Sequence, residues 1–216
     1  ERARTARRRF LELSPSARTV AEAGRSWREG DAARAEELCE EVLKSDPANT
    51  DALRLLASIA IADERYVIAE GLLKRLVKLS ANHYLAHNEL GRFLGDRGRI
   101  PEAIEEMRLA VELGPGFADN HRVLGDLLST IGQNEEALAA YEEALRLEPT
   151  DAAALAGRGH ALRILGRSDE AVAAYEECTR LRPDTGDVWW SLATMRGYAF
   201  SEEQLATMRQ RLESEE

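Results

Sequence analysis

The sequence has little cysteine and no long apolar run. Its 216 residues include two cysteines, Cys39 and Cys178, and both stand at apolar positions. Two distant cysteines do not make the disulfide framework of a small secreted domain, so we expect buried free thiols rather than a disulfide. No segment approaches the roughly 20 apolar residues that span a bilayer, and no signal-peptide core is present. The sequence therefore predicts a cytoplasmic protein with no membrane partner.

Positive charge is also scarce. Acidic residues outnumber basic ones by 39 to 29, which leaves a net charge of −10. Nucleic-acid binding depends on a positive surface that replaces phosphate counterions, so we expect no nucleic-acid partner. Charged residues form 31% of the chain and hydrophobic residues 44%, a balance that predicts an ordered protein rather than a disordered one.

Catalytic and cofactor motifs are missing. The sequence contains no phosphate-binding G-x-x-x-x-G-K-[ST], no G-x-G-x-x-G and no H-E-x-x-H. His83 and His87 have the i,i+4 spacing of two metal ligands on a helix, but no third ligand accompanies them. His87 and His121 also occupy the same place in a repeat described below, which favours a structural role. We predict no catalytic residue, no metal and no cofactor in this chain.

What the sequence does contain is a strict period of 34 residues. Alanine recurs at this spacing at five positions, and glycine and proline recur at others. The alanines are Ala35, Ala69, Ala103, Ala137 and Ala171; the glycines are Gly98, Gly132 and Gly166; the prolines are Pro47, Pro115, Pro149 and Pro183. Each period reads as two amphipathic helices joined by a tight turn.

The residue sizes within one period predict how its two helices pack. Each first helix has Ala or Gly at the eighth residue of the period, and each second helix has the recurring alanine at the twentieth. Small residues at both places let the two helix backbones approach closely. Bulkier residues follow four positions after that alanine: Cys39, Leu73, Met107, Tyr141 and Tyr175. Glu64 stands where other repeats have a turn glycine, so we expect its turn to differ slightly in geometry.

This pattern resembles the tetratricopeptide repeat, W-x2-L-G-x2-Y…A-x3-F…P. Trp189 matches the aromatic position, Leu124-Gly125 the Leu-Gly pair, and Ala137, Tyr141 and Pro149 the rest. The resemblance implies an all-α protein, a right-handed α-solenoid of stacked antiparallel helix pairs. We expect an N-terminal helix over 1–15, five repeats over 16–185 and a divergent sixth repeat over 186–216.

Both ends depart from the regular pattern. The Arg-rich segment 1–13 is read either as a helix that caps or continues the array, or as a tether for an acidic partner. The sixth repeat is expected to open with a helix over 187–198. Ser201 and Gln204 then form a capping box, flanked by Phe200 and Leu205 as a hydrophobic staple. The apolar stripe of the closing helix, over 202–212, comprises Leu205, Met208 and Leu212. It suggests a chain cut within a longer protein, or a docking face that permits end-to-end self-association.

The first helices of such repeats line a concave face that binds extended ligands. The family pattern of groove-facing positions points to ten candidate peptide-binding residues: Arg54, Ser58, Asn88, Arg92, Asp119, Arg122, Asp126, His160, Arg163 and Trp190. Lysine is absent from the positions with which related co-chaperones hold a C-terminal carboxylate, so that clamp is not expected. The arginines could bind a peptide with acidic groups, or they could neutralise the neighbouring aspartates.

The last repeat also resembles a more specific family. The segment Asp187-Val-Trp-Trp-Ser-Leu-Ala193 and the following Tyr198 to Met208 are similar to a W-W-S-L-A segment of bacterial tetratricopeptide-repeat sulfotransferases. That resemblance implies that this chain is the substrate-recruiting repeat domain of an enzyme using the sulfate donor PAPS, whose catalytic domain is absent here. The alternative is a stand-alone adaptor that assembles a multiprotein complex.

Overall fold

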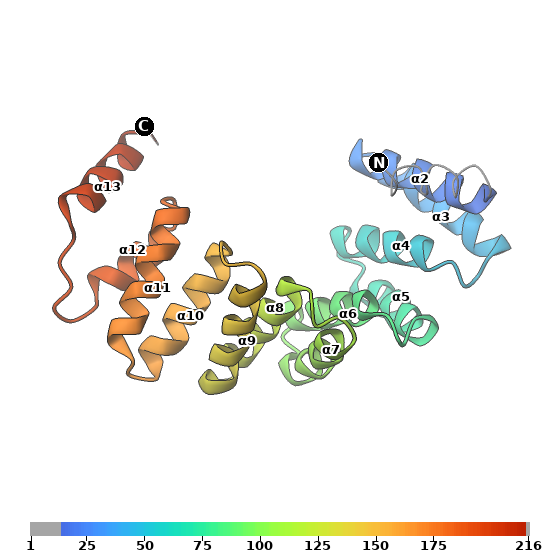
Figure 1. Ribbon diagram of the computed structural model, residues 1–216. Coiled ribbons are helices and arrows are strands. Elements are labelled where there is room, and N and C mark those ends of the chain that lie inside the picture. The colour runs from blue at the N-terminus through green and yellow to red at the C-terminus, as the bar shows by residue number, and fades with distance from the viewer. Residues whose placement is uncertain (1–13, 215–216) are drawn as a thin grey trace. The chain divides into compact units, whose positions relative to one another are not determined.

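The structure, a computed structural model, describes residues 14–214 as helices joined by short turns, without strands in that range (Figure 1). The helices are α2 (Pro15–Arg28), α3 (Ala32–Ser45), α4 (Thr50–Ala62), α5 (Tyr66–Leu79), α6 (Tyr84–Asp96), α7 (Ile100–Leu113), α8 (Ala118–Thr130), α9 (Asn134–Leu147), α10 (Ala152–Ile164), α11 (Ser168–Leu181), α12 (Gly186–Ala193) and α13 (Glu202–Ser214). The predicted all-α repeat fold is confirmed. The Arg-rich segment 1–13 lies outside the described residues.

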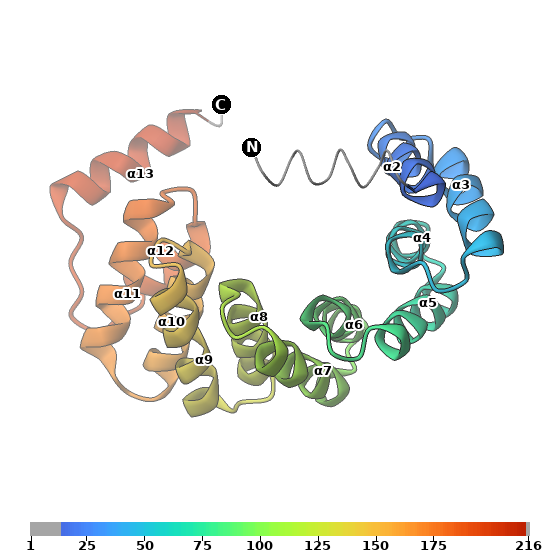
Figure 2. The same cartoon turned by 45° about the vertical axis from the view of Figure 1, so that its right-hand side comes forward.

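The chain divides into two compact bodies, Glu1–Phe93 and Leu94–Glu216, with the boundary inside α6. In the N-terminal body α2 pairs with α3 and α4 with α5, and α2 also contacts α4 (Figure 2). In the C-terminal body the corresponding pairs are α8 with α9 and α10 with α11, and α8 contacts α10. In both bodies, therefore, first helices of successive repeats contact each other.

The small residues fit the close helix contacts expected for them. All five recurring alanines are fully buried. A Cβ atom added to Gly159 would lie 2.4 Å from the Tyr175 ring, and one added to Gly125 would lie 2.8 Å from the Tyr141 ring. The aromatic rings thus occupy the space that glycine leaves open. Ala193, at the aligned position of the last repeat, is instead exposed because α12 ends there.

The turn at Glu64 stays close to the glycine turns of the other repeats. Glu64 has a φ of 57°, in the same left-handed region as Gly98, Gly132 and Gly166 at 73–78°. The turn therefore differs only slightly from the glycine turns, as expected, because the flanking helices impose nearly the same turn on a residue with a side chain. That backbone conformation is strained for glutamate.

A repeated polar contact between a ring nitrogen and a backbone carbonyl lies near the start of three first helices. The ring nitrogens of His87, His121 and Trp189 lie 2.9–3.0 Å from the carbonyl oxygens six residues earlier. The last of these is a bond that the Trp189 indole donates to Pro183. The shared structural role expected of His87 and His121 is therefore confirmed.

Both cysteines are free and buried, as expected. Burial, together with the charge of Glu36, raises the pKa of Cys39 to about 11, and burial also raises the pKa of Cys178. The Cys178 thiol donates to the Ala152 carbonyl at 3.2 Å. Both side chains therefore act as protonated core groups.

The last repeat differs partly from its expected form. Its first helix ends at Ala193 rather than continuing to Tyr198, and Gly197, with a φ of 80°, follows that end. The capping box is confirmed, since the Ser201 and Gln204 side chains each accept from the other's backbone N–H, at 3.2 and 2.9 Å. Of the predicted apolar stripe, Leu205 and Met208 are half-buried, while the Leu212 side chain lies outside the description.

Candidate functional site

The ten sequence-predicted binding residues fall into two groups, one in each body. Arg54, Ser58, Asn88 and Arg92 belong to the N-terminal body, and Asp119, Arg122, Asp126, His160, Arg163 and Trp190 to the C-terminal body. Asn88 is buried, whereas Trp190 is 72% exposed. Of these residues, Arg54 and Ser58 line one surface hollow, and Asp126 and His160 line another.

The first of these, the N-terminal hollow, lies between α2 and α4. Its apolar side comes from both helices, through residues such as Val20 and Leu55. Its charged side carries three arginines and two acids: Arg25, Arg28, Arg54, Asp51 and Glu89. Arg54 lies 3.5 Å from Asp51 and 3.8 Å from Glu89, so both contacts are loose ion pairs.

Glu89 is the most perturbed acid of the N-terminal hollow. Desolvation raises its pKa to about 7, with the Asp51 charge adding to the rise and the Arg54 charge opposing it. A carboxyl group with such a pKa changes its charge near neutral pH. The balance of charge in this hollow therefore shifts toward the positive as the pH falls.

The second, the C-terminal hollow, is formed by side chains of α8, α9, α10 and α12. Its floor consists of small residues of α10, Ala153, Ala156 and Gly157, and the Tyr141 ring lies against Gly157. Its polar rim includes Asp126 and Ser129 of α8, His160 of α10 and Asp187 of α12. Small side chains on α10 leave this hollow open.

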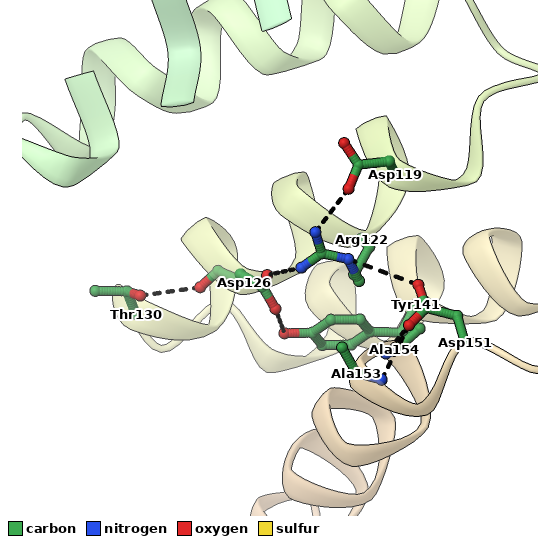
Figure 3. Close-up of polar contacts among 8 residues, drawn as sticks. All are labelled: Asp119, Arg122, Asp126, Thr130, Tyr141, Asp151, Ala153 and Ala154. Carbon is green, nitrogen blue, oxygen red and sulfur yellow. Dashed lines mark hydrogen bonds and ion pairs between the residues drawn. The ribbon is translucent and has the colours of Figure 1, made fainter. Parts of the chain in front are cut away.

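Arg122, beside the C-terminal hollow, is surrounded by carboxylates (Figure 3). Its guanidinium group bonds to Asp119 at 2.6 Å and to Asp126 at 2.8 Å, and it lies 3.6 Å from Asp151, the residue just before α10. Asp151 also caps α10 by accepting from the backbone N–H groups of Ala153 and Ala154. Three negative charges thus surround one positive charge. At Arg122, mutual neutralisation rather than a free arginine is observed.

Two buried rings carry polar groups toward this hollow. The Tyr141 hydroxyl donates to Asp126 at 2.8 Å, and burial together with that carboxylate raises the pKa of Tyr141 far above its ordinary value. The Tyr175 hydroxyl lies 2.8 Å from His160 Nδ1. Burial and the nearby Arg163 charge lower the pKa of His160, although Asp187 opposes them. His160 is therefore neutral at pH 7.

Several lining residues of the two hollows are not evident from the repeat pattern. Glu89 was missed because it lies outside the groove-facing positions of the repeat pattern. The Gly157 floor was missed because its place in the repeat is not one at which the family pattern requires glycine. The segment AAALAG of α10 consists mostly of small residues, and it could have predicted both the floor of the C-terminal hollow and the space above it.

Two further findings concern other kinds of site. Within residues 14–214, no three His, Cys, Asp or Glu side chains lie together in a way that would hold a metal ion. No helix in that range combines the length and apolar character needed to cross a membrane.

Solved structures with a similar fold include MamA, with 25% sequence identity over 76% of this chain and 96% of that one, at a TM-score of 0.68. YrrB, described as a TPR protein with an unusual peptide-binding site, is 17% identical over 86% of this chain and 97% of its own, with a TM-score of 0.69. MamA from Desulfovibrio magneticus RS-1 is 18% identical over 80% of this chain and 98% of its own, with a TM-score of 0.69. The latter two likenesses show the fold alone. No curated protein matches the chain.

Family models described as tetratricopeptide repeat match residues 26–79, 62–116 and 122–194. These matches cover most of the chain, and the structure has the helix pairs that such repeats form. The chain belongs to the tetratricopeptide repeat family, whose fold serves as a protein-interaction scaffold.

Proposed function

We propose that this chain is a scaffold that binds an extended peptide through hollows on the first helices of its repeats. The observation that carries the proposal is that both hollows lie on such helices and combine an apolar floor or side with charged groups. That combination suits a peptide, whose backbone and side chains need both. The proposal requires neither a cofactor nor a catalytic residue.

The N-terminal hollow is proposed to accept an acidic group of the peptide. Arg25, Arg28 and Arg54 outnumber the two acids there, and Glu89 is partly protonated near neutral pH. A guanidinium group can form two parallel hydrogen bonds to a carboxylate, which favours arginine in this role. The present ion pairs of Arg54 are long, so a ligand carboxylate can replace them.

The test compares labelled peptides of equal length, one containing two glutamates and one containing two glutamines, by fluorescence anisotropy. The glutamate peptide is expected to bind more tightly, and Arg54→Ala to weaken its binding about five- to tenfold. Arg18→Ala is the matched control, because Arg18 is an exposed residue of α2 that does not line the hollow. Equal binding of both peptides, or equal loss in both variants, would rule out this assignment.

A second candidate function rests on the sequence of the last repeat. The Trp189-Trp190-Ser191-Leu192-Ala193 segment supports a role as the recruiting domain of a PAPS-dependent sulfotransferase, with the acceptor held by the hollows. The coding sequence after Glu216 tests it. A following α/β domain with a phosphate-binding loop would support the proposal, and a stop codon would exclude it.

The alternative adaptor function places a docking or self-association face on α13, where Leu205 and Met208 are half-buried. Light scattering tests self-association directly. A dimer that Leu205→Ser/Met208→Ser returns to a monomer would support this face. A monomer at all concentrations up to about 100 μM would exclude self-association with micromolar affinity.

A further inference from the structure

The charge of the C-terminal hollow differs from that of the N-terminal hollow. Its rim has two carboxylates, Asp126 and Asp187, and one arginine, Arg182. Arg182 is paired with Asp184 at 3.2 Å, so it adds little positive charge. His160 is neutral at pH 7, because its environment disfavours the charged form.

The arginines near the rim do not offset this negative charge. Arg122 is shared among three aspartates, which leaves a surplus of two negative charges in that network. Arg163 lies about one turn beyond His160 on α10. Its charge lowers the pKa of His160, but it does not line the hollow, and its single positive charge does not cancel that surplus. An acidic ligand would therefore meet net repulsion here.

Asp187 is the group available to a ligand. Its side chain is exposed, and among residues 14–214 its carboxylate makes no hydrogen bond or ion pair. Asp126, in contrast, accepts from both Arg122 and Tyr141. A cation entering the hollow would find Asp187 unpaired on one side and Asp126 on the other.

An exposed aromatic residue lies on the same face of α12 as Asp187. Trp190 is three residues further along the helix, and residues at this spacing are neighbours on a helix surface. Its ring is 72% exposed and is the most exposed tryptophan of the chain within the described residues. Guanidinium and ammonium groups are attracted to the face of an indole ring.

We propose that the C-terminal hollow binds an arginine or lysine side chain of the peptide, with Asp187 of its lining as the counter-ion and the exposed Trp190, which lies outside the lining one turn further along α12, as the stacking partner. The small floor of Ala153, Ala156 and Gly157 provides the room for the side chain's aliphatic stem. This inference rests on the proposed peptide-binding function and assigns opposite charge preferences to the two hollows.

The experiment is an NMR titration of the full chain, labelled with ¹⁵N, with two blocked tetrapeptides, Gly-Arg-Ala-Gly and Gly-Glu-Ala-Gly. The arginine peptide is expected to shift amide signals within 153–160 and 187–190. Asp187→Asn and Trp190→Ala should each weaken its binding about two- to fivefold. Asp169→Asn is the matched control, because Asp169 is an exposed acid in the first turn of α11, outside the hollow, and its loss changes the net charge equally.

The outcomes separate the two proposals. If Asp187→Asn and Asp169→Asn weaken binding equally, or if the glutamate peptide shifts the same amides as strongly, the inference is overturned. If only the glutamate peptide binds, and only in the N-terminal hollow, the inference fails while the proposed function stands. If neither peptide shifts signals of either hollow, both proposals fail. If Asp187→Asn perturbs α12, Trp190→Ala still tests the inference, because the Trp190 side chain is exposed and its loss does not disturb the packing of the helix.

Discussion

The Tyr141 hydroxyl donates a 2.8 Å hydrogen bond to Asp126 Oδ1, while Oδ2 of the same carboxylate accepts from Arg122. The Tyr141 ring itself is buried against Gly125 of its own repeat and Gly157 of the next. One aromatic residue therefore joins two repeats and orients an acid on the rim of the C-terminal hollow. The packing between these two repeats and the orientation of Asp126 therefore both depend on the Tyr141 side chain.

Gly157→Ala is expected to destabilise the chain. An added Cβ would lie 2.4 Å from Tyr141 Cζ, and Gly125 on the other side leaves the ring little room to move. Overpacking of about 1–3 kcal/mol outweighs the gain in helix propensity of up to about 1 kcal/mol. Gly71→Ala is the control, because nothing lies within 4 Å of its added Cβ. Thermal unfolding should show a lower midpoint for the first variant and a higher one for the second; the reverse order would refute this packing argument.

Arg122→Met is expected to cost about 1–3 kcal/mol of unfolding free energy. The substitution leaves three aspartates close together without their shared cation, and the Arg122 side chain is only 21% exposed. Arg146→Met removes a single pair with Glu143, at a side chain that is 64% exposed, and should cost less than about 0.5 kcal/mol. Chemical denaturation in low and high salt measures both. Salt should reduce the loss caused by Arg122→Met, since it screens the exposed aspartates. Similar losses in both variants would contradict a special role for Arg122.

Glu64→Gly is expected to stabilise the N-terminal body by about 0.5–1 kcal/mol. Glu64 has a φ of 57°, which costs a non-glycine residue about 1–2 kcal/mol, although glycine also loses more entropy on folding. The converse change, Gly132→Ala, places a side chain at a φ of 78° and should destabilise by about 1 kcal/mol. Urea unfolding of both variants checks the prediction. A loss of stability in Glu64→Gly would show that the glutamate side chain makes a compensating contact.

The fold was predictable because the signal recurs. The same helix contact requires the same side-chain size in each repeat. This contact explains the alanine at five equivalent sites and the glycine opposite Tyr141 and Tyr175. Prediction is less exact where a residue departs from the average of its equivalents. Glu64 keeps the glycine conformation because tertiary packing overrides its local preference, and α12 ends early in a repeat whose sequence has diverged.

The site was less predictable, for reasons of geometry. The repeat pattern placed Arg122 and Asp126 near the groove, and the alternative of mutual neutralisation was foreseeable from their spacing. The contact with Asp151 depends on how the next repeat stacks, which sequence spacing does not give. Asn88 was expected in the groove but is buried, and sequence spacing does not give the burial of one side chain among its equivalents.

Glu89 should make the stability of the chain depend on pH in a direction unusual for a carboxyl group. Burial raises its folded-state pKa to about 7, against an ordinary value of 4.5. Between these values the folded chain holds a proton that the unfolded chain has lost. The stabilisation is therefore fully present below about pH 4.5 and is lost as the pH rises through 7.

Glu89→Gln removes this titration without changing the shape of the side chain. Relative to the variant, the wild-type chain is expected to lose on the order of 2 kcal/mol of unfolding free energy between pH 5 and pH 8. Glu41→Gln, at an exposed position of α3, is the control and should leave the pH profile of the wild type unchanged. Urea denaturation followed by tryptophan fluorescence measures all three proteins, with Trp27 of the N-terminal hollow as a nearby reporter. Because the difference between variant and wild type cancels every other titrating group, parallel profiles would show that Glu89 is ionised without cost, and its burial would then have no effect on the charge of the hollow.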